Sequence, residues 1–197
     1  MEDIISTTTT PAGLHLFDIN DECPKLDKAR SERFHHVVTK LLYLSKSARP
    51  DIETAVAFLC TRVPKSDEDD WKELRRLSMY FNGTMNIPRI IGATSLTDLY
   101  SWVDASYTVH WDMKSHTDGV MSFSHGALHT KSSKQKSNTK SSTEAKLAGI
   151  SSYSPYNIWM RMFLKQQGYD LEDNIMFQDN QSTIILQTTK VLQKYTK

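Results

Sequence analysis

The chain has 197 residues, enough for one domain or for a small domain with an attached helical piece. A hydrophobic share of 39% and a charged share of 24% argue against a disordered chain, and no apolar run is long enough to span a membrane. The start, "MEDIISTTTTPAG", lacks the apolar core of a secretory signal, and we expect a flexible segment over residues 1–30. Two widely separated cysteines, Cys23 and Cys60, are typical of a reducing compartment, so we expect an intracellular, cytoplasmic or nuclear protein that is not secreted.

Three stretches of the first half have the apolar spacing of amphipathic helices, residues 31–46, 51–63 and 66–81. Asp51 is the expected cap of the second helix. Ser66 and Asp69 have the spacing of a capping box for the third helix. The run of four acids after Ser66 is expected to be a solvated cap that opposes the helix dipole.

A turn-rich connector, residues 81–96, separates this helical pattern from a different one. Short apolar runs then predict the order strand, hairpin, helix, strand, helix, which is typical of a mixed sheet with flanking helices. We therefore expect a helical segment over residues 31–97 and a second domain over residues 98–197. The predicted fold class is α+β or mixed α/β.

The elements of the second domain can be placed on the sequence. Strands are expected over residues 99–106 and 174–179, and helices over 142–167 and 180–189. Gly126 and Ala127 suit a two-residue type II′ hairpin turn. Pro155 should kink or split the first helix. The expected inward side chains of that helix are Leu147, Ile150, Ile158, Met162 and Phe163.

Two aspartates end predicted strands, Asp104 and Asp179, and Glu144 stands in the first turn of a predicted helix. For Glu144 alone a helix cap is the simpler explanation, because Ser141 stands three residues before it as in a capping box. Together the three acids can share one cleft at a sheet edge, where like charges repel unless divalent cations neutralise them. Oxygen ligands favour Mg²⁺ or Mn²⁺, and two such ions can activate water for phosphodiester cleavage.

Lysines gather around the same region, although the net charge of the chain is only +1. Five of them surround the single acid Glu144: Lys131, Lys134, Lys136, Lys140 and Lys146. Such a band can follow a phosphate backbone, which makes nucleic acid a candidate partner. A solvated surface loop is the blander explanation and the more common one.

Four stretches resemble the ribonuclease H domain of copia-type LTR retrotransposon polyproteins: "VDASY", "SHTDGVMSF", "HTKSSKQKSNTKSSTEAKLAG" and "FQDNQSTI". Upstream, "ARPDIETAVAFL" and "DEDDWKELRRLSMYFNGT" resemble the end of the reverse transcriptase in the same polyproteins. The resemblance implies a ribonuclease H-like sheet and an endonuclease that cuts the RNA strand of RNA–DNA hybrids. It also implies two Mg²⁺ (or Mn²⁺) ions held by the catalytic residues Asp104, Glu144 and Asp179. The lysines expected to contact the hybrid, or another nucleic acid, are Lys131, Lys134, Lys136 and Lys140.

The chain departs from this family pattern in several places. Asp118 stands where the family usually has a glycine, and Lys146 stands where it usually has a second glutamate. No Asp or Glu follows Asp179, whereas the family has a fourth carboxylate there, and the paired aspartates of the polymerase are absent. We therefore expect a C-terminally truncated ribonuclease H domain with impaired cleavage. The alternative is a non-catalytic transposon remnant that keeps only the fold or weak nucleic-acid binding.

Histidines and tryptophans near the hairpin have simpler explanations than a site. The four histidines lack a zinc-binding spacing and are expected to pack in or on the hairpin: His110, His116, His125 and His129. Trp102 and Trp111 can stack on bases, but core or strand-face packing is the more common use of such residues.

Overall fold

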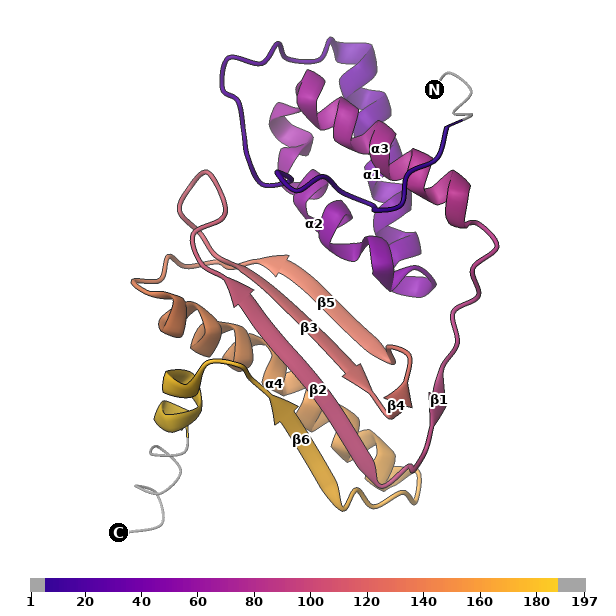
Figure 1. Cartoon of the computed structure of the whole chain (residues 1–197), viewed down its shortest axis with the longest axis vertical. Helices are drawn as coiled ribbons and strands as arrows, with labels where there is room; N and C mark the ends of the chain where they lie inside the picture. Colours follow the sequence, from indigo (N-terminus) through magenta and orange to yellow (C-terminus); the bar gives the residue numbers. More distant parts are fainter. Residues whose placement is uncertain (1–5, 188–197) are drawn as a thin grey trace. The chain divides into compact units, whose positions relative to one another are not determined.

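The computed structural model describes residues 6–187 and divides the chain into two compact units, Met1–Arg89 and Ile90–Lys197. In the described residues, the first unit is built of helices, and the second carries a mixed sheet with a long helix (Figure 1). The mixed α/β fold class expected from the sequence is confirmed. The boundary between the units falls within the turn-rich connector, eight residues before the domain start expected at residue 98.

The three helices expected in the first unit are present. Their bounds, with two short 3₁₀ turns between them, are α1 Lys28–Ser47, η1 Pro50–Ile52, α2 Glu53–Arg62, η2 Val63–Lys65 and α3 Glu68–Thr84. Apolar side chains at helical spacing meet in one core, whose fully buried members include Phe34, Val38, Ile52, Val56, Leu59, Leu74 and Leu77. The segment before α1 adds Leu16 to this core, so part of the expected flexible segment packs on the helices.

Two expected helix caps are wrong. Helix α3 is capped one residue later than expected: Asp67 Oδ1 accepts the backbone N–H groups of Asp69 and Asp70, and the Asp70 carboxylate accepts the N–H of Asp67. The box is therefore Asp67 with Asp70, and not Ser66 with Asp69. Asp51 does not cap α2, because its carboxylate accepts hydrogen bonds from an arginine and a tyrosine side chain instead.

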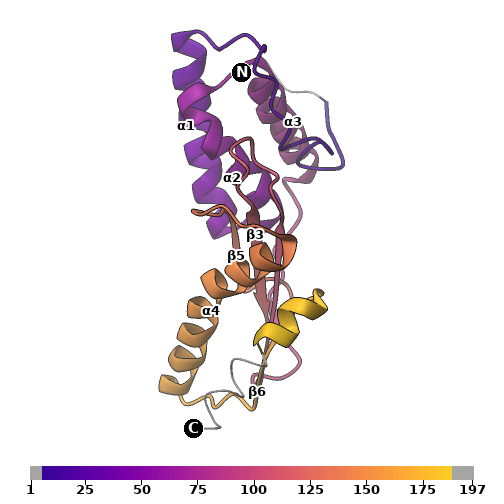
Figure 2. The ribbon, with the colours of Figure 1, turned by 90° about the vertical axis from the view of Figure 1, so that its left-hand side faces the viewer.

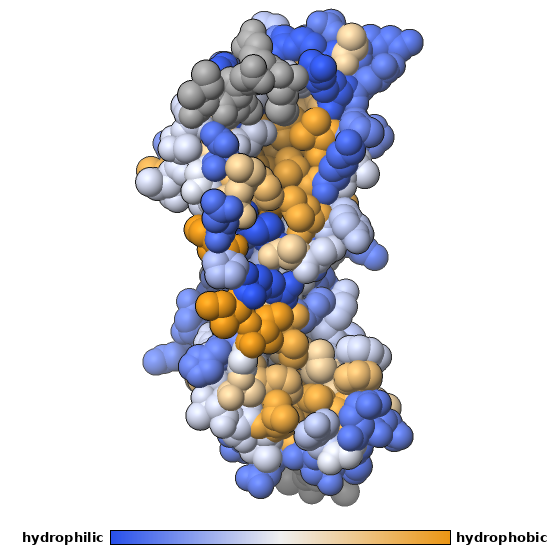
Figure 3. All heavy atoms as spheres, turned by 90° about the vertical axis from the view of Figure 1, so that its right-hand side faces the viewer, coloured by the Kyte–Doolittle hydropathy of each residue, from blue (hydrophilic) through white to orange (hydrophobic). Residues whose placement is uncertain are grey.

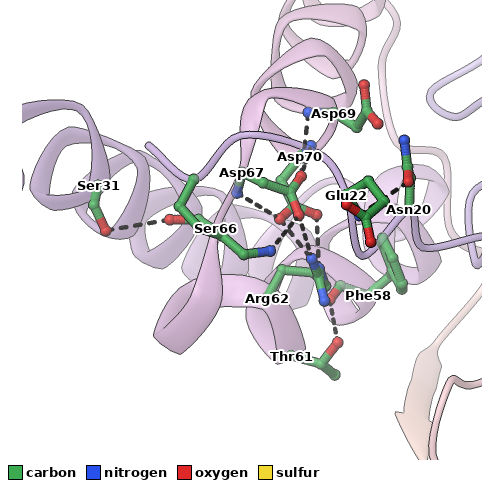
Figure 4. A network of polar contacts seen from close by, with 11 residues as sticks. Asn20, Glu22, Ser31, Phe58, Thr61, Arg62, Ser66, Asp67, Asp69 and Asp70 are labelled. Atoms are coloured by element: carbon green, nitrogen blue, oxygen red, sulfur yellow. Dashed lines mark hydrogen bonds and ion pairs between the residues drawn. The ribbon is translucent and has the colours of Figure 1, made fainter. Parts of the chain in front are cut away.

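A buried ion network holds the start of α3 against the end of α2 (Figure 4). Arg62 donates from Nε to Asp70 at 2.8 Å and from Nη2 to Asp67 at 2.7 Å. Lys25 is a second cation on Asp67, at 3.1 Å. The expected solvated cap is thus wrong for these two acids, which are buried because a cation on the neighbouring helix compensates them.

The second unit is built on a four-stranded sheet in the order β5-β3-β2-β6. Its strands are β2 Asp98–Ser106, β3 His116–Ser122, β5 His129–Lys134 and β6 Asp173–Phe177. Strand β3 runs antiparallel to β2 and β5, whereas β6 runs parallel to β2. A parallel neighbour requires a crossover, and helix α4, Ser142–Gln166, provides it between β5 and β6. Residues 181–187 are helical after β6; residues 188 and 189 of the helix expected there lie outside the described residues.

Helix α4 covers one face of this sheet (Figure 2). Small residues permit the close approach: a Cβ on Gly149 would lie 3.2 Å from Thr117, and a Cβ on Gly119 would lie 2.3 Å from the ring of Tyr153. The buried residues of the helix are Ala145, Gly149, Ile150, Tyr153, Asn157 and Leu164. Of the inward residues expected from the sequence, only Ile150 is among them, and Ile158, Met162 and Phe163 are exposed. Pro155 does not split the helix, which continues through it.

The hairpin between β3 and β5 is confirmed, but its two-residue turn is wrong. Met121 pairs with His129, so the connection spans residues 122–128. Within it β4, Ser124–His125, pairs with the short strand β1, Gly92–Ala93. Gly126 has a positive φ of 71°, and a Cβ there would lie 1.9 Å from the carbonyl oxygen of Ile90. The glycine is therefore required by its left-handed backbone conformation and by the close contact with Ile90.

Apolar side chains also reach the surface in both units, as one face of the molecule shows in Figure 3. On the sheet, Trp102 and Phe177 stack at a ring separation of 5.3 Å, and Tyr100 lies 6.2 Å from Phe177. Within residues 6–187, no helix combines the length and the apolar character that crossing a membrane requires.

Candidate carboxylate site at the ends of β2 and β6

The sheet register brings two of the three candidate carboxylates together. Trp102 of β2 pairs with Phe177 of the parallel strand β6. Asp104 follows Trp102 by two residues and Asp179 follows Phe177 by two residues, so the same register places the two aspartates side by side. Both side chains are largely exposed, at 63% for Asp104 and 73% for Asp179.

Lys146 of α4 joins these two aspartates. Its Nζ lies 2.6 Å from Oδ1 of Asp104 and 2.6 Å from Oδ1 of Asp179. Lys146 is the fifth residue of α4 and follows Ala145, which is fully buried. Its side chain is only 13% exposed, so the aliphatic part is covered while the ammonium reaches the carboxylates.

The electrostatics of this bridge keep the lysine charged. Burial by itself lowers the pKa of Lys146, but the hydrogen bonds to Asp104 and Asp179 outweigh it and raise that pKa above the ordinary value. The hydrogen bond from Lys146 lowers the pKa of Asp179. At neutral pH the bridge therefore consists of an ammonium between two carboxylates.

A hollow of about 500 Å³ opens in front of the bridge. It is lined by Trp102, Val103, Asp104, Asp118, Gly119, Val120, Phe177, Gln178 and Asp179. Asp118 pairs directly across the strands with Asp104, so both side chains stand on the same face of the sheet. The sequence marks Asp118 as an unusual charge, and the β2–β3 register reveals that it adjoins the candidate site.

Glu144 does not line this hollow. Its carboxylate accepts the backbone N–H of Lys140 at 2.7 Å, and its own N–H donates to the side chain of Ser141 at 3.1 Å. Ser141 is thus the N-cap of α4, and only half of the expected capping box forms, because Glu144 accepts the N–H of Lys140 and not that of Ser141. Glu144 borders a separate hollow on the helix. The structure brings Asp104 and Asp179 together and leaves Glu144 outside that pair.

The residues present do not fit a divalent metal ion. Within residues 6–187, no three His, Cys, Asp or Glu side chains are arranged to hold one. Oδ1 of Asp104 and Oδ1 of Asp179, the oxygens that face each other, already accept the ammonium of Lys146. The ammonium of Lys146 therefore lies between the two aspartates.

The four candidate phosphate-binding lysines fall into two pairs. Lys131 donates to the Ser152 hydroxyl at 2.7 Å, and Lys134 lies 2.8 Å from a carboxylate oxygen of Asp112. Both are partly buried and engaged in contacts within the protein. Lys136 and Lys140 are exposed on the connector between β5 and α4. The second pair is therefore better placed to meet a phosphate backbone.

The histidines lie in or on the hairpin region as expected from the sequence, and His125 is exposed on β4. His110 and His116 are buried, with 3.0 Å between their facing ring nitrogens, and His116 also lies 2.8 Å from the Ser132 hydroxyl. His129 stacks on Tyr156 at a ring separation of 4.8 Å.

The chain is similar to retrotransposon proteins. It is 26% identical over 194 residues to the retrovirus-related Pol polyprotein from transposon TNT 1-94 of Nicotiana tabacum, a match that covers 96% of this chain and 14% of that polyprotein. It is 27% and 28% identical over 139 residues to the retrovirus-related Pol polyproteins from transposons RE2 and RE1 of Arabidopsis thaliana. These two matches cover 70% of this chain and 10% and 9% of the relatives. No protein-family model and no solved structure matches the chain.

These similarities support a retrotransposon-derived protein that corresponds to part of a Pol polyprotein. The chain spans only a seventh or less of the relatives it matches, so their other activities do not transfer to it.

Proposed function

We propose that the second unit is a copia-type ribonuclease H-like domain derived from a retrotransposon, and that the first unit comes from the end of the reverse transcriptase region. In the family that the sequence resembles, this domain cuts the RNA strand of RNA–DNA hybrids with the help of Mg²⁺. The support is the pair Asp104 and Asp179 at neighbouring strand ends, with Glu144 starting the helix that crosses over between β5 and β6. These residues occur in the chain order of the resembling motifs.

We also propose that cleavage is impaired in this chain. The observation that carries this part is the ammonium of Lys146, which lies 2.6 Å from each aspartate. A protonated lysine has no lone pair with which to take a proton from water, and it leaves the facing carboxylate oxygens occupied. The raised pKa of Lys146 keeps it in that protonated form at neutral pH.

A second candidate function is nucleic-acid binding without cleavage. It is favoured by the exposed Lys136 and Lys140, which precede α4 on the connector from β5. Contacts of this kind give sequence-independent affinity that falls with salt, by a slope of about −0.9 in the logarithmic plot for each phosphate neutralised. Two lysines therefore predict a slope of about −2.

The two candidates are separated by one pair of assays on the full chain. We expect no Mg²⁺-dependent cleavage of a labelled RNA–DNA hybrid above that of Asp104→Asn, together with weak, salt-sensitive binding of the same hybrid. The double variant Lys136→Glu, Lys140→Glu should lose this binding, whereas Lys165→Glu, on an exposed turn at the other end of α4, should keep it. Robust cleavage that disappears in Asp104→Asn would establish an active nuclease, and a chain that neither binds nor cuts the hybrid would remove the proposed function.

A further inference from the structure

We infer that the ammonium of Lys146 is a built-in counterion of Asp104 and Asp179, and that it excludes a divalent cation from the space between them. This deepens the proposed function and rests on it in one respect: a divalent cation is taken as the ion that the site would otherwise hold. The geometry itself does not depend on any activity.

The ammonium and a metal ion bound between the aspartates would need the same two carboxylate oxygens. Oδ1 of Asp104 and Oδ1 of Asp179 each lie 2.6 Å from Nζ of Lys146. A magnesium ion bound between the aspartates would sit about 2.1 Å from its oxygens, which is where the ammonium already lies. A metal ion that used these two oxygens could bind only after both hydrogen bonds break and Lys146 turns away.

The fold also holds Lys146 close to these carboxylates. Its neighbour Ala145 is fully buried, and Gly149, one turn further, packs so closely on the sheet that a Cβ there would lie 3.2 Å from Thr117. The start of α4 is therefore fixed on β2 and β3. A cation on such a short tether acts at an effective concentration on the order of millimolar or higher, whereas a free ion must lose its water shell to compete.

The site would keep its negative charge if the lysine were removed. Asp118 lines the same hollow and stands directly across from Asp104. Without the ammonium of Lys146, three aspartates would face one hollow, and like charges at this spacing attract a cation from solution. Loss of Lys146 should therefore create a cation site that the unaltered chain does not offer.

The test is a titration of the full chain with Mn²⁺ alone, followed by electron paramagnetic resonance of the free ion and by calorimetry. We expect Lys146→Met to bind one more Mn²⁺ than the unaltered chain. The dissociation constant of this added site should be at least about tenfold lower than that of any Mn²⁺ binding by the unaltered chain, on the scale of one charge interaction near a protein surface. Adding Asp179→Asn to Lys146→Met should abolish the new site. Lys165→Met, which removes an exposed lysine from the same helix, should bind like the unaltered chain.

A second substitution, Lys146→Gln, keeps the test decisive if the methionine variant folds poorly, since an amide can still donate to the aspartates without a charge. Equal Mn²⁺ affinity in the unaltered chain and in these variants would overturn the inference, and so would failure of both folded variants to gain a site. The readout involves no nucleic acid. A chain that fails to bind or cut a hybrid therefore removes the proposed function while the Mn²⁺ result still decides the role of Lys146.

Discussion

Each unit contains a cation that bridges two aspartates, and the two bridges differ in what surrounds them. In the first unit Arg62 binds Asp67 and Asp70, and the three side chains are 7%, 3% and 5% exposed. In the second unit Lys146 is 13% exposed, but its aspartates are 63% and 73% exposed. The first bridge is closed on both sides, whereas the second is covered only on the side of the cation.

The difference indicates different roles. Both oxygens of Asp67 are used within the first unit, by the backbone N–H groups that it caps and by Arg62 and Lys25. Removing one partner there would strand a buried charge. At the second bridge water can replace the lysine, because the carboxylates already face solvent. The first bridge is part of the architecture, whereas the second adds little to the stability of its unit.

The largest expected effect is on the first bridge. Arg62→Met should destabilise the first unit by about 3–5 kcal/mol, because it leaves the carboxylates of Asp67 and Asp70 buried without their main cation. Hydrogen exchange in α2 and α3 measures this loss unit by unit. Arg75→Met, on the exposed side of α3, is the matched control and should change stability by less than about 0.5 kcal/mol. A loss no larger than that of the control would show that the buried bridge does not hold the helices.

The next effect concerns acid. Burial, together with the neighbouring His116 and Lys134, lowers the pKa of His110 to about 4 from an ordinary value of 6.5. As pH falls through 6.5 the unfolded chain gains a proton that the folded unit does not accept, so the stability of the second unit falls until about pH 4. The expected loss over this range is about 3 kcal/mol, from about 2.5 pKa units at about 1.4 kcal/mol each.

The first unit should respond to acid later. Burial alone would raise the pKa of Asp67, but the N–H of Asp70 and the cations Lys25 and Arg62 outweigh it and lower that pKa below 3.8. The contribution of Asp67 to stability is present above pH 3.8 and is lost only as pH falls below that value.

The effect of His110 on the second unit can be measured by urea unfolding of Trp71→Phe, in which the other three of the four tryptophans report on the second unit alone. The midpoint should be lower at about pH 5 than at about pH 7. An unchanged midpoint would contradict the buried-histidine account.

A smaller effect is expected at the second bridge. Lys146→Met should change the urea midpoint of the second unit by less than about a quarter of the change that Arg62→Met causes in the first, because exposed ion pairs add little stability. The remaining difference should shrink further in about 1 M salt, where charges are screened over about 3 Å. A destabilisation as large as that of Arg62→Met would mean that the lysine bridge is architectural and would break the comparison.

The smallest effect tests the repulsion around that bridge. Asp118 and Asp104 are directly opposite on antiparallel strands, so Asp118→Asn should stabilise the second unit by a few tenths of a kcal/mol. The gain should be larger in the Lys146→Met background, where no ammonium offsets the two charges. The double-mutant cycle in urea measures this coupling, and a zero coupling would separate Asp118 from the site.

Much of the fold follows from the apolar pattern of the sequence, because the helical spacing of residues such as Phe34, Val38 and Leu59 is the spacing of the core itself. The errors arise where tertiary contacts decide. The acid run after Ser66 contains two overlapping capping boxes, and Arg62, from another helix, selects Asp67 and Asp70. In α4 the large apolar residues suggest the wrong face, because the face on the sheet mixes the small Ala145 and Gly149 with Tyr153, which packs over Gly119.

The candidate site shows the same limit. That Asp104 and Asp179 meet follows from strand order, since both stand at the ends of strands that become parallel neighbours. Lys146 is visible in the sequence only as a reversed charge near Glu144. Its reach to both aspartates depends on how α4 crosses the sheet, and no local spacing encodes that distance.

The most direct test of the lysine bridge is a crystal structure of the unaltered chain grown with Mn²⁺, with diffraction data collected for the anomalous signal of manganese. We expect the ammonium of Lys146 between Asp104 and Asp179, within hydrogen-bond distance of both, and no anomalous peak between the carboxylates. An anomalous peak at that position, with Lys146 turned away from the aspartates, would contradict the account.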